Sequence, residues 1–338
     1  MIKSLSCDAP GKLIYRDAEF PFPKDGEVIL KVTHIGICGT DLHAFEGNQP
    51  FFQYPRILGH ELAAVVEDAN GIEGFTRGEQ VTIIPYFSCG QCIACRKGRT
   101  NCCVNIRVFG VHIDGGMREF ISVPATALVK SSGLTAELLA LTEPLAIGAH
   151  GVGRAEINEK NTILVIGSGP IGLATMMMAK VAGARVIAID KSQRRLEFAV
   201  SNKNADHIIN STEEDALEKI KDFTNGDMPD VVFDATGNRS AINGGFSFVS
   251  HGGKYVLIGL QKEEIVFSHP EFHKREATLM SSRNATRKDF DQVIGLISSG
   301  KIDSAPLITH RVSFDQVKDK FKTWLDPLNG VIKAMVQL

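Results

Sequence analysis

Five of the seven cysteines in this 338-residue chain lie between residues 89 and 103, in the sequence CGQCIACRKGRTNCC. In a reducing compartment, clustered cysteines are more often metal ligands than disulfides, and an odd total agrees with that interpretation. Four thiolates form a closed tetrahedral zinc site that leaves no position for a substrate. Such a site stabilises a long loop with little core of its own, because the metal offsets the entropy of closing the loop. We therefore expect a metal site in this segment.

Three further motifs in the N-terminal half contain residue types that can act at a metal. GICGTDLHAFEG supplies Cys38, Thr40 and His43, ILGHELAAVVE supplies His60 and Glu61, and LTEPLAIGAH supplies Glu143. Each of these residues, taken alone, is more often part of a core than a ligand. Together, one thiolate, one imidazole and one or two carboxylates give zinc a mixed shell that can leave one position open for water or substrate. The set therefore predicts a catalytic metal site.

The sequence VIGSGPIG predicts a dinucleotide site, because it follows an apolar strand pattern and opens a helix pattern. Its glycines, Gly167, Gly169 and Gly172, allow a tight turn, a close approach to a pyrophosphate and close packing of the helix on the strand. The expected cofactor contacts are Gly167, Gly169, Pro170, Ile171, Gly172, Asp190, Lys191, Arg195 and Thr236.

Asp190 ends the next predicted strand and favours NAD over NADP. Its carboxylate can bind both ribose hydroxyls and would repel a 2′-phosphate. Lys191, Arg194 and Arg195 lie next to it in the sequence and weaken that preference. These basic residues can equally form a solvated helix face, and one of them can stack on the adenine.

Charge and composition point to a small-molecule substrate rather than a polymer or membrane partner. The net charge is -2, and acidic and basic residues are mixed along the chain, so nucleic acid is not an expected partner. For the same reason, a nucleic-acid-binding zinc ribbon is the weaker interpretation of the cysteine cluster. The N-terminal sequence MIKSLSCDAPGK lacks the features of an export signal, so we expect a cytoplasmic protein.

The elements that must position these residues differ between two parts of the chain. Residues 27–129 alternate apolar and polar residues between glycine-rich turns, which predicts a β-rich region. From residue 161, strand and helix patterns alternate, which predicts a doubly wound parallel sheet in an α/β protein. A helix over 287–302 and a strand over 330–338 follow. The charge-free run 161–179 is long enough for a membrane span, but its GSGP sequence indicates a turn.

These motifs, in this order, resemble those of the zinc-dependent medium-chain dehydrogenases, the alcohol dehydrogenase family. The resemblance extends from about residue 25 to the C-terminus and is carried by GICGTDLHAFEG, GHE, the cysteine spacing C-x2-C-x2-C-x7-C and GSGPIG. It implies a GroES-like, β-rich catalytic domain from residues 1–148 and 288–338, and a Rossmann NAD-binding domain from residues 149–287. It also implies two zinc ions per chain, and we expect a homo-oligomer, dimer or tetramer.

The resemblance assigns the zinc ligands and the proton relay. The structural zinc would be bound by Cys89, Cys92, Cys95 and Cys103, which leaves Cys102 as the spare cysteine; Cys7 is expected to be a small apolar core residue. The catalytic zinc would be bound by Cys38, His60 and Glu143, directly or through water in the case of Glu143, with Glu61 as a fourth or alternating ligand. Thr40 and His43 resemble the family's proton relay.

The branch of the family indicates the substrate. Glu143 replaces the cysteine of the simple alcohol dehydrogenases, which favours the polyol, threonine and sugar-acid enzymes, and GNQPFF, GRTNCC, PEFHKRE and SSRNAT are most similar to L-galactonate 5-dehydrogenases. We expect oxidation of a secondary hydroxyl of a sugar acid, with Arg283 binding the carboxylate and Arg107 and His112 as weaker candidates. Polyol or L-threonine dehydrogenases are the alternatives. Outside the enzymes, the alternative is a NAD-binding or structural protein that keeps the fold without turnover.

Overall fold

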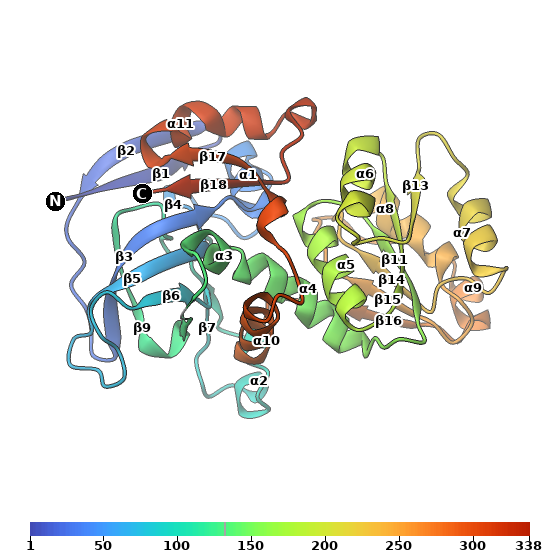
Figure 1. Ribbon diagram of the computed structural model, residues 1–338, viewed down its shortest axis with the longest axis horizontal. Coiled ribbons are helices and arrows are strands. Elements are labelled where there is room, and N and C mark those ends of the chain that lie inside the picture. The colour runs from blue at the N-terminus through green and yellow to red at the C-terminus, as the bar shows by residue number, and fades with distance from the viewer. Residues whose placement is uncertain (132) are drawn as a thin grey trace. The chain divides into compact units, whose positions relative to one another are not determined.

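A computed structural model of the protein describes residues 1–131 and 133–338, which form two compact units (Figure 1). The first unit contains Met1–Glu143 and Ala285–Leu338, and the second contains Pro144–Asn284. The boundaries expected from the sequence, after residues 148 and 287, lie a few residues later. Helix α4 (Thr142–Ala155) runs across the first boundary, so no turn signal in the sequence marks it.

The first unit is built on a seven-stranded sheet with the order β10-β6-β5-β3-β18-β17, in which β9 also pairs with β3. Its strands are β3 (Glu27–Gly36), β5 (Glu61–Asp68), β6 (Gln80–Ile83), β9 (Phe120–Pro124), β10 (Leu128–Lys130), β17 (Ile308–Ser313) and β18 (Lys333–Gln337). Strand β3 pairs antiparallel with both β5 and β18, so Gly36 lies opposite Glu61 on one side and Met335 on the other. The C-terminal strand is thereby placed next to the strands that carry the predicted metal ligands.

Smaller elements complete the first unit. They are the sheet β2-β1-β4 (Lys12–Ala18, Ile2–Ala9 and Arg56–Ile57), the pair β7 (Tyr86–Phe87) and β8 (Arg107–Val108), and the helices α1 (Gly39–Glu46), α2 (Ile93–Arg96), α3 (Ala136–Ala140), α10 (Arg287–Ser298) and α11 (Val317–Lys320). The core of this unit is formed by alternate residues of the strands, such as Val28, Leu30 and Val32 of β3, and by Phe45 of α1, which packs against Phe321.

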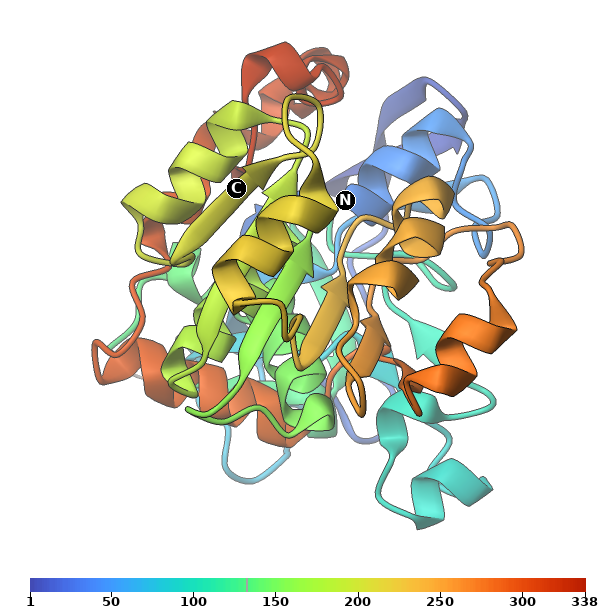
Figure 2. The same ribbon diagram turned by 90° about the vertical axis from the view of Figure 1, so that its right-hand side faces the viewer.

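The second unit is a six-stranded parallel sheet with the order β13-β12-β11-β14-β15-β16, whose strands lie side by side in Figure 2. Its strands are β11 (Thr162–Ile166), β12 (Arg185–Asp190), β13 (His207–Asn210), β14 (Val231–Asp234), β15 (Lys254–Leu257) and β16 (Thr278–Ser281), and its helices are α5 (Pro170–Val181), α6 (Gln193–Ser201), α7 (Ala216–Thr224), α8 (Arg239–Gly245) and α9 (His269–Lys274). The inner strands are continuous apolar runs. This suits a parallel sheet, in which helices cover both faces and bury every side chain of the inner strands. The predicted fold class, a β-rich part with a doubly wound parallel sheet, is confirmed.

The charge-free run 161–179 is divided between strand β11 and helix α5, with the GSGP turn between them. Within the described residues, no helix combines the length and apolar character needed to cross a membrane. The predicted helix over 287–302 corresponds to α10, and the predicted strand over 330–338 corresponds to β18.

Candidate active site

Cys38, His60 and Glu61 lie together at one end of strands β3 and β5. Cys38 follows β3 and is the N-cap residue of α1, and Glu61 begins β5 opposite Gly36. One ligand atom from each of the three side chains lies within 4.8 Å of the other two. The Nδ1 atom of His60 is buried and has no hydrogen-bond partner among the described residues. A soft sulfur, an imidazole and a carboxylate at these distances are a donor set that suits zinc.

Asp41 fixes the two segments that carry this set. Its Oδ2 accepts a hydrogen bond from the backbone N–H of Cys38 at 3.0 Å, and its Oδ1 accepts one from Gly59 at 3.1 Å. The same Oδ1 lies 3.7 Å from Nδ1 of His60. Asp41 is fully buried, and its two hydrogen bonds hold the backbone at Cys38 and at Gly59 in place. The sequence does not identify Asp41 as part of the site, although an acid three residues after the N-cap is a signal for helix capping.

Lys333 is a buried cation beside the predicted ligands. Its ammonium group donates to Oε1 and Oε2 of Glu61 at 2.5 and 2.7 Å and to the carbonyl oxygen of Ile37 at 3.0 Å. A Cβ atom on Gly36 would lie 2.1 Å from Oε2 of Glu61, so only glycine leaves room for the carboxylate there. The signal for Lys333 in the sequence is a single charge within the apolar run VIKAMV.

Glu143 lies outside the group formed by Cys38, His60 and Glu61. It is 3% exposed at the start of α4, and its Oε1 accepts a hydrogen bond from the phenol of Tyr86, which is also buried. Burial raises the pKa of the Glu143 carboxyl to about 7, with the negative charge of Glu61 acting in the same direction and His60 opposing it. Tyr86 is a residue that the motifs do not identify.

The charges of this cluster favour a bound cation. Burial alone lowers the pKa of His60, but the charges of Cys38 and Asp41 raise it well above its usual range. Burial raises the pKa of Asp41. Acids that are buried together are costly to ionise unless a cation lies among them. The residues therefore fit a divalent metal such as zinc.

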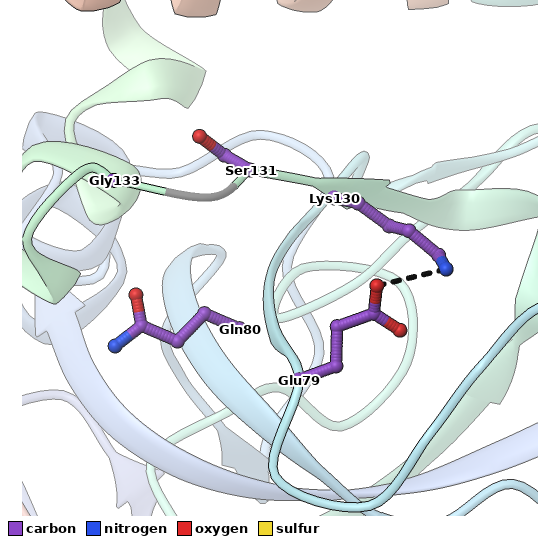
Figure 3. A pocket seen from close by; sticks show the side chains of 5 residues that line it. All are labelled: Glu79, Gln80, Lys130, Ser131 and Gly133. Atoms are coloured by element: carbon purple, nitrogen blue, oxygen red, sulfur yellow. Dashed lines mark ion pairs between the residues drawn. The ribbon is translucent and has the colours of Figure 1, made fainter.

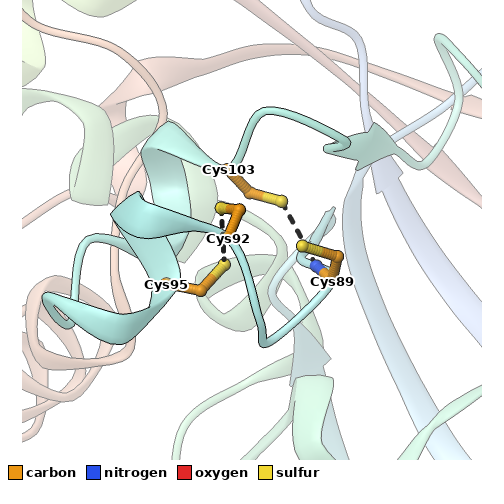
Figure 4. Close-up of side chains that lie close together, drawn as sticks. All are labelled: Cys89, Cys92, Cys95 and Cys103. Carbon is orange, nitrogen blue, oxygen red and sulfur yellow. Dashed lines mark hydrogen bonds between the residues drawn. The ribbon is translucent and has the colours of Figure 1, made fainter.

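The four cysteines expected at a structural zinc also lie together. One sulfur from each of Cys89, Cys92, Cys95 and Cys103 lies within 4.8 Å of the others, and Figure 4 shows the four side chains facing one another. The Sγ of Cys92 lies 3.4 Å from that of Cys95, and the backbone N–H of Cys89 donates to the sulfur of Cys103 at 3.2 Å. Helix α2, between them, has no buried residue, so a metal can supply the stability that a core does not.

The thiols in this cluster differ in acidity. Backbone N–H groups of Cys95 and Val104 lower the pKa of Cys92 to about 6, whereas burial and the neighbouring thiol of Cys92 raise the pKa of Cys95 to about 11. A zinc ion binds the deprotonated form of all four. Cys102 is exposed and outside the cluster. Cys7 is buried in the core of the first unit.

The glycine-rich turn of the second unit has the geometry that close approach of a phosphate requires. Gly167 has a φ of 96°, and a Cβ atom on Gly172 would lie 1.8 Å from the carbonyl oxygen of Gly167. Gly169 is the N-cap residue of α5, and Pro170 is its first residue, with Ile171 next. The buried hydroxyl of Ser168 in this turn has no hydrogen-bond partner among the described residues. The turn therefore suits a dinucleotide.

Asp190 lies at the end of β12, beside this turn. Its Oδ2 accepts a hydrogen bond from the N–H of Ser168 at 2.6 Å, and its Oδ1 accepts one from Ser192 at 2.8 Å. Arg195 reaches to 3.9 Å from the position of a Cβ atom on Gly169, while Lys191 and Arg194 are exposed. Thr236 packs against Gly167 and donates to Asp234, a buried acid that the motifs do not identify.

The remaining predicted residues have different surroundings. Thr40 and His43 lie on α1, and the exposed His43 pairs with Glu46, with 3.5 Å between Nδ1 and Oε2. Arg283 is exposed and lies in the second unit, whereas the predicted zinc ligands lie in the first. Arg107 is exposed on β8, and Nδ1 of His112 accepts a hydrogen bond from Val108 at 2.9 Å.

A separate surface hollow of about 520 Å³ is lined by Glu79, Gln80, Lys130, Ser131 and Gly133 (Figure 3). Lys130 and Glu79 form an ion pair at 2.8 Å across it. None of the predicted site residues lines this hollow, and its own charges are paired. It therefore has no part in the expected chemistry.

Comparison with known families and relatives defines the class of this protein. Residues 24–133 match the model of the alcohol dehydrogenase GroES-like domain, and residues 170–299 match that of the zinc-binding dehydrogenases. The chain therefore belongs to the zinc-binding, medium-chain alcohol dehydrogenase family. The predictions of a GroES-like domain, of a Rossmann-type sheet and of a zinc-dependent dehydrogenase are confirmed at the level of the family.

Individual relatives match over almost their whole lengths. L-Galactonate-5-dehydrogenase of Escherichia coli strain K12 is 43% identical over 333 residues, which are 98% of this chain and 98% of that protein. L-Threonine 3-dehydrogenase of Pyrococcus abyssi is 35% identical over 330 residues, 95% of this chain and 94% of that protein. A crystal structure of an alcohol dehydrogenase from Escherichia coli CFT073, in complex with NADH, has a TM-score of 0.93 and 32% identity and covers 100% of this chain and 99% of that one.

Proposed function

We propose that this protein oxidises a secondary hydroxyl of a small sugar acid, such as L-galactonate, to a keto acid and transfers the hydride to NAD. The observation that carries the proposal is the 43% identity with L-galactonate-5-dehydrogenase over nearly the full length of both chains. The clustered Cys38, His60 and Glu61 support it, because a silent relative would be expected to lose at least one residue of the site. We also propose a cytoplasmic location and a homo-oligomer.

The chain's residues divide the work of the reaction. Cys38, His60 and Glu143 are the proposed ligands of the catalytic zinc, with Glu61 as a fourth or alternating ligand, and Cys89, Cys92, Cys95 and Cys103 are those of the structural zinc. Bound zinc supplies the Lewis acidity that makes a substrate hydroxyl easier to deprotonate. Thr40 accepts the hydroxyl proton, and the exposed His43 passes it to solvent. The substrate thereby loses a hydride to NAD and a proton to water.

A substrate panel tests the proposal. Aldonates, neutral polyols and amino alcohols are assayed for the appearance of NADH, and we expect the highest kcat/KM with an aldonate. A preference for L-threonine or sorbitol would contradict the sugar-acid assignment while leaving the dehydrogenase class intact. L-Threonine is the main competing substrate, because of the 35% identity with the threonine enzyme.

Arg283 is the proposed partner of the substrate carboxylate. We expect Arg283→Ala to lower kcat/KM for an aldonate by a factor on the order of ten to a hundred, the loss of a charged hydrogen bond, and to leave a neutral polyol nearly unaffected. The control is Arg239→Ala, which removes an exposed arginine of the same unit that pairs with Glu263. If kcat/KM fell equally for the aldonate and the neutral polyol, Arg283 would act on the fold or the cofactor and not on the substrate carboxylate.

Asp190 is the proposed determinant of cofactor choice. We expect NAD to be the better cofactor by a wide margin and Asp190→Ala to narrow the gap, because the variant loses the ribose contacts and no longer repels a 2′-phosphate. The measurement is kcat/KM for NAD and NADP with wild type and variant, and Asp227→Ala, an exposed acid of the same unit, is the control. Equal efficiency of the wild type with both cofactors would contradict the assignment.

A further inference from the structure

Two buried carboxylates, Glu61 and Glu143, lie near Cys38 and His60. A catalytic zinc with an open position takes three protein ligands, so only one of these carboxylates is needed beside the thiolate and the imidazole. The two acids differ in the groups that donate hydrogen bonds to them.

Glu61 is already engaged on both oxygens. Lys333 donates to each of them, and the carboxylate is packed against the backbone at Gly36, where a Cβ atom would lie 2.1 Å from Oε2. The ammonium group neutralises the charge of Glu61 at short range. To serve as a metal ligand, Glu61 would have to share its oxygens with the ammonium group of Lys333, which donates a hydrogen bond to each of them.

Glu143 is held differently. Within the described residues, its one side-chain hydrogen bond is the one that Oε1 accepts from the phenol of Tyr86. A phenol is neutral, so this contact fixes the orientation of the carboxylate and leaves its negative charge and its Oε2 available. Carboxylate ligands of metals are commonly oriented by a hydrogen bond of this type.

Tyr86 is itself firmly placed. It is 8% exposed and lies on β7, which pairs antiparallel with β8 through Tyr86 and Val108. These two short strands flank the cysteine-rich segment, since Cys89 follows β7 and Cys103 precedes β8. A metal bound by the four cysteines would therefore also hold the strand pair that carries Tyr86.

We propose that Tyr86 is a positioning residue that holds Glu143 through Oε1 and thereby presents its second oxygen to the catalytic metal. The inference rests on the proposed function, because it takes Cys38 and His60 as the other ligands. Lys333 neutralises the charge of the neighbouring Glu61 by donating to both of its oxygens.

The test measures the rate at which the variant Tyr86→Phe releases zinc to a chromophoric chelator. The variant Cys38→Ser, which should lack the catalytic zinc, shows which phase of the release belongs to that site. We expect release from the catalytic site to become about 10 to 100 times faster and release from the four-cysteine site to stay unchanged. With cobalt(II) at the catalytic site, Tyr86→Phe should have a visible absorption spectrum that differs from that of the cobalt-loaded wild type. The matched control is Tyr255→Phe, which removes a buried phenol that donates to Ile242 in the other unit.

A double-variant comparison checks that Tyr86 acts through Glu143. Glu143→Gln should itself speed zinc release, and adding Tyr86→Phe to it should cause little further change, because the two residues act as one unit. Release from Tyr86→Phe at the wild-type rate or slower, or fully additive effects, would overturn the inference alone. A wild type that binds one zinc, unaffected by Cys38→Ser, would overturn the proposed function as well.

Discussion

Cys38→Ser should reduce turnover on the order of 10³-fold or more, because it removes the thiolate that Cys38 provides at the N-cap of α1. A serine hydroxyl keeps the size of the side chain but is a poor ligand for zinc beside His60 and a carboxylate. The hydrogen bonds of Asp41 to the backbone at Cys38 and Gly59 do not depend on the sulfur, so the fold should remain. NADH formation measures the first effect, and circular dichroism measures the second.

Cys102→Ser is the control for this experiment, because Cys102 is exposed and outside both groups of ligands. It should keep wild-type turnover. Normal turnover in Cys38→Ser would contradict the assignment of the catalytic site, and a loss of turnover with an unfolded spectrum would show that Cys38 supports the fold instead.

Cys95→Ser should instead destabilise the protein. Helix α2 has no buried residue, and Ile93 and Val104 are 58% and 68% exposed. Burial of apolar side chains therefore does little to hold this helix in place. Opening a structural metal site is among the few single changes that cost more than about 4 kcal/mol, which corresponds to a fall in melting temperature on the order of 10 °C. Thermal unfolding and soluble yield measure this effect.

The same Cys102→Ser variant controls for the loss of one thiol from the segment and should melt within a degree or two of the wild type, as expected for an exposed substitution. If Cys95→Ser melted at the wild-type temperature, the four cysteines would not hold a structural metal. Loss of turnover without loss of stability would give the segment a different role.

The features that could be predicted from the sequence are local in the chain. The four cysteines lie within fifteen residues of sequence and the glycine turn within six, so their spacing alone indicates the geometry. The alternation of strand and helix likewise predicts a parallel sheet, because only a covered sheet tolerates continuous apolar strands. These predictions depend on no contact between distant segments.

The features that could not be predicted depend on contacts between distant segments. Lys333 reaches Glu61 only because β18 pairs with β3, and Tyr86 reaches Glu143 across 57 residues of sequence. Nothing in either local sequence determines those pairings. The partner of Glu61 and the orientation of Glu143 are therefore results of the structure.

The most direct test of the account is the zinc content of three purified proteins, measured by elemental analysis. We expect about two zinc ions per chain in the wild type and about one in Cys38→Ser, with the remaining ion in that variant bound by the four cysteines. Cys95→Ser should keep the catalytic ion in the fraction that stays soluble. One zinc ion per chain in the wild type, or two in Cys38→Ser, would contradict the assignment of two separate sites.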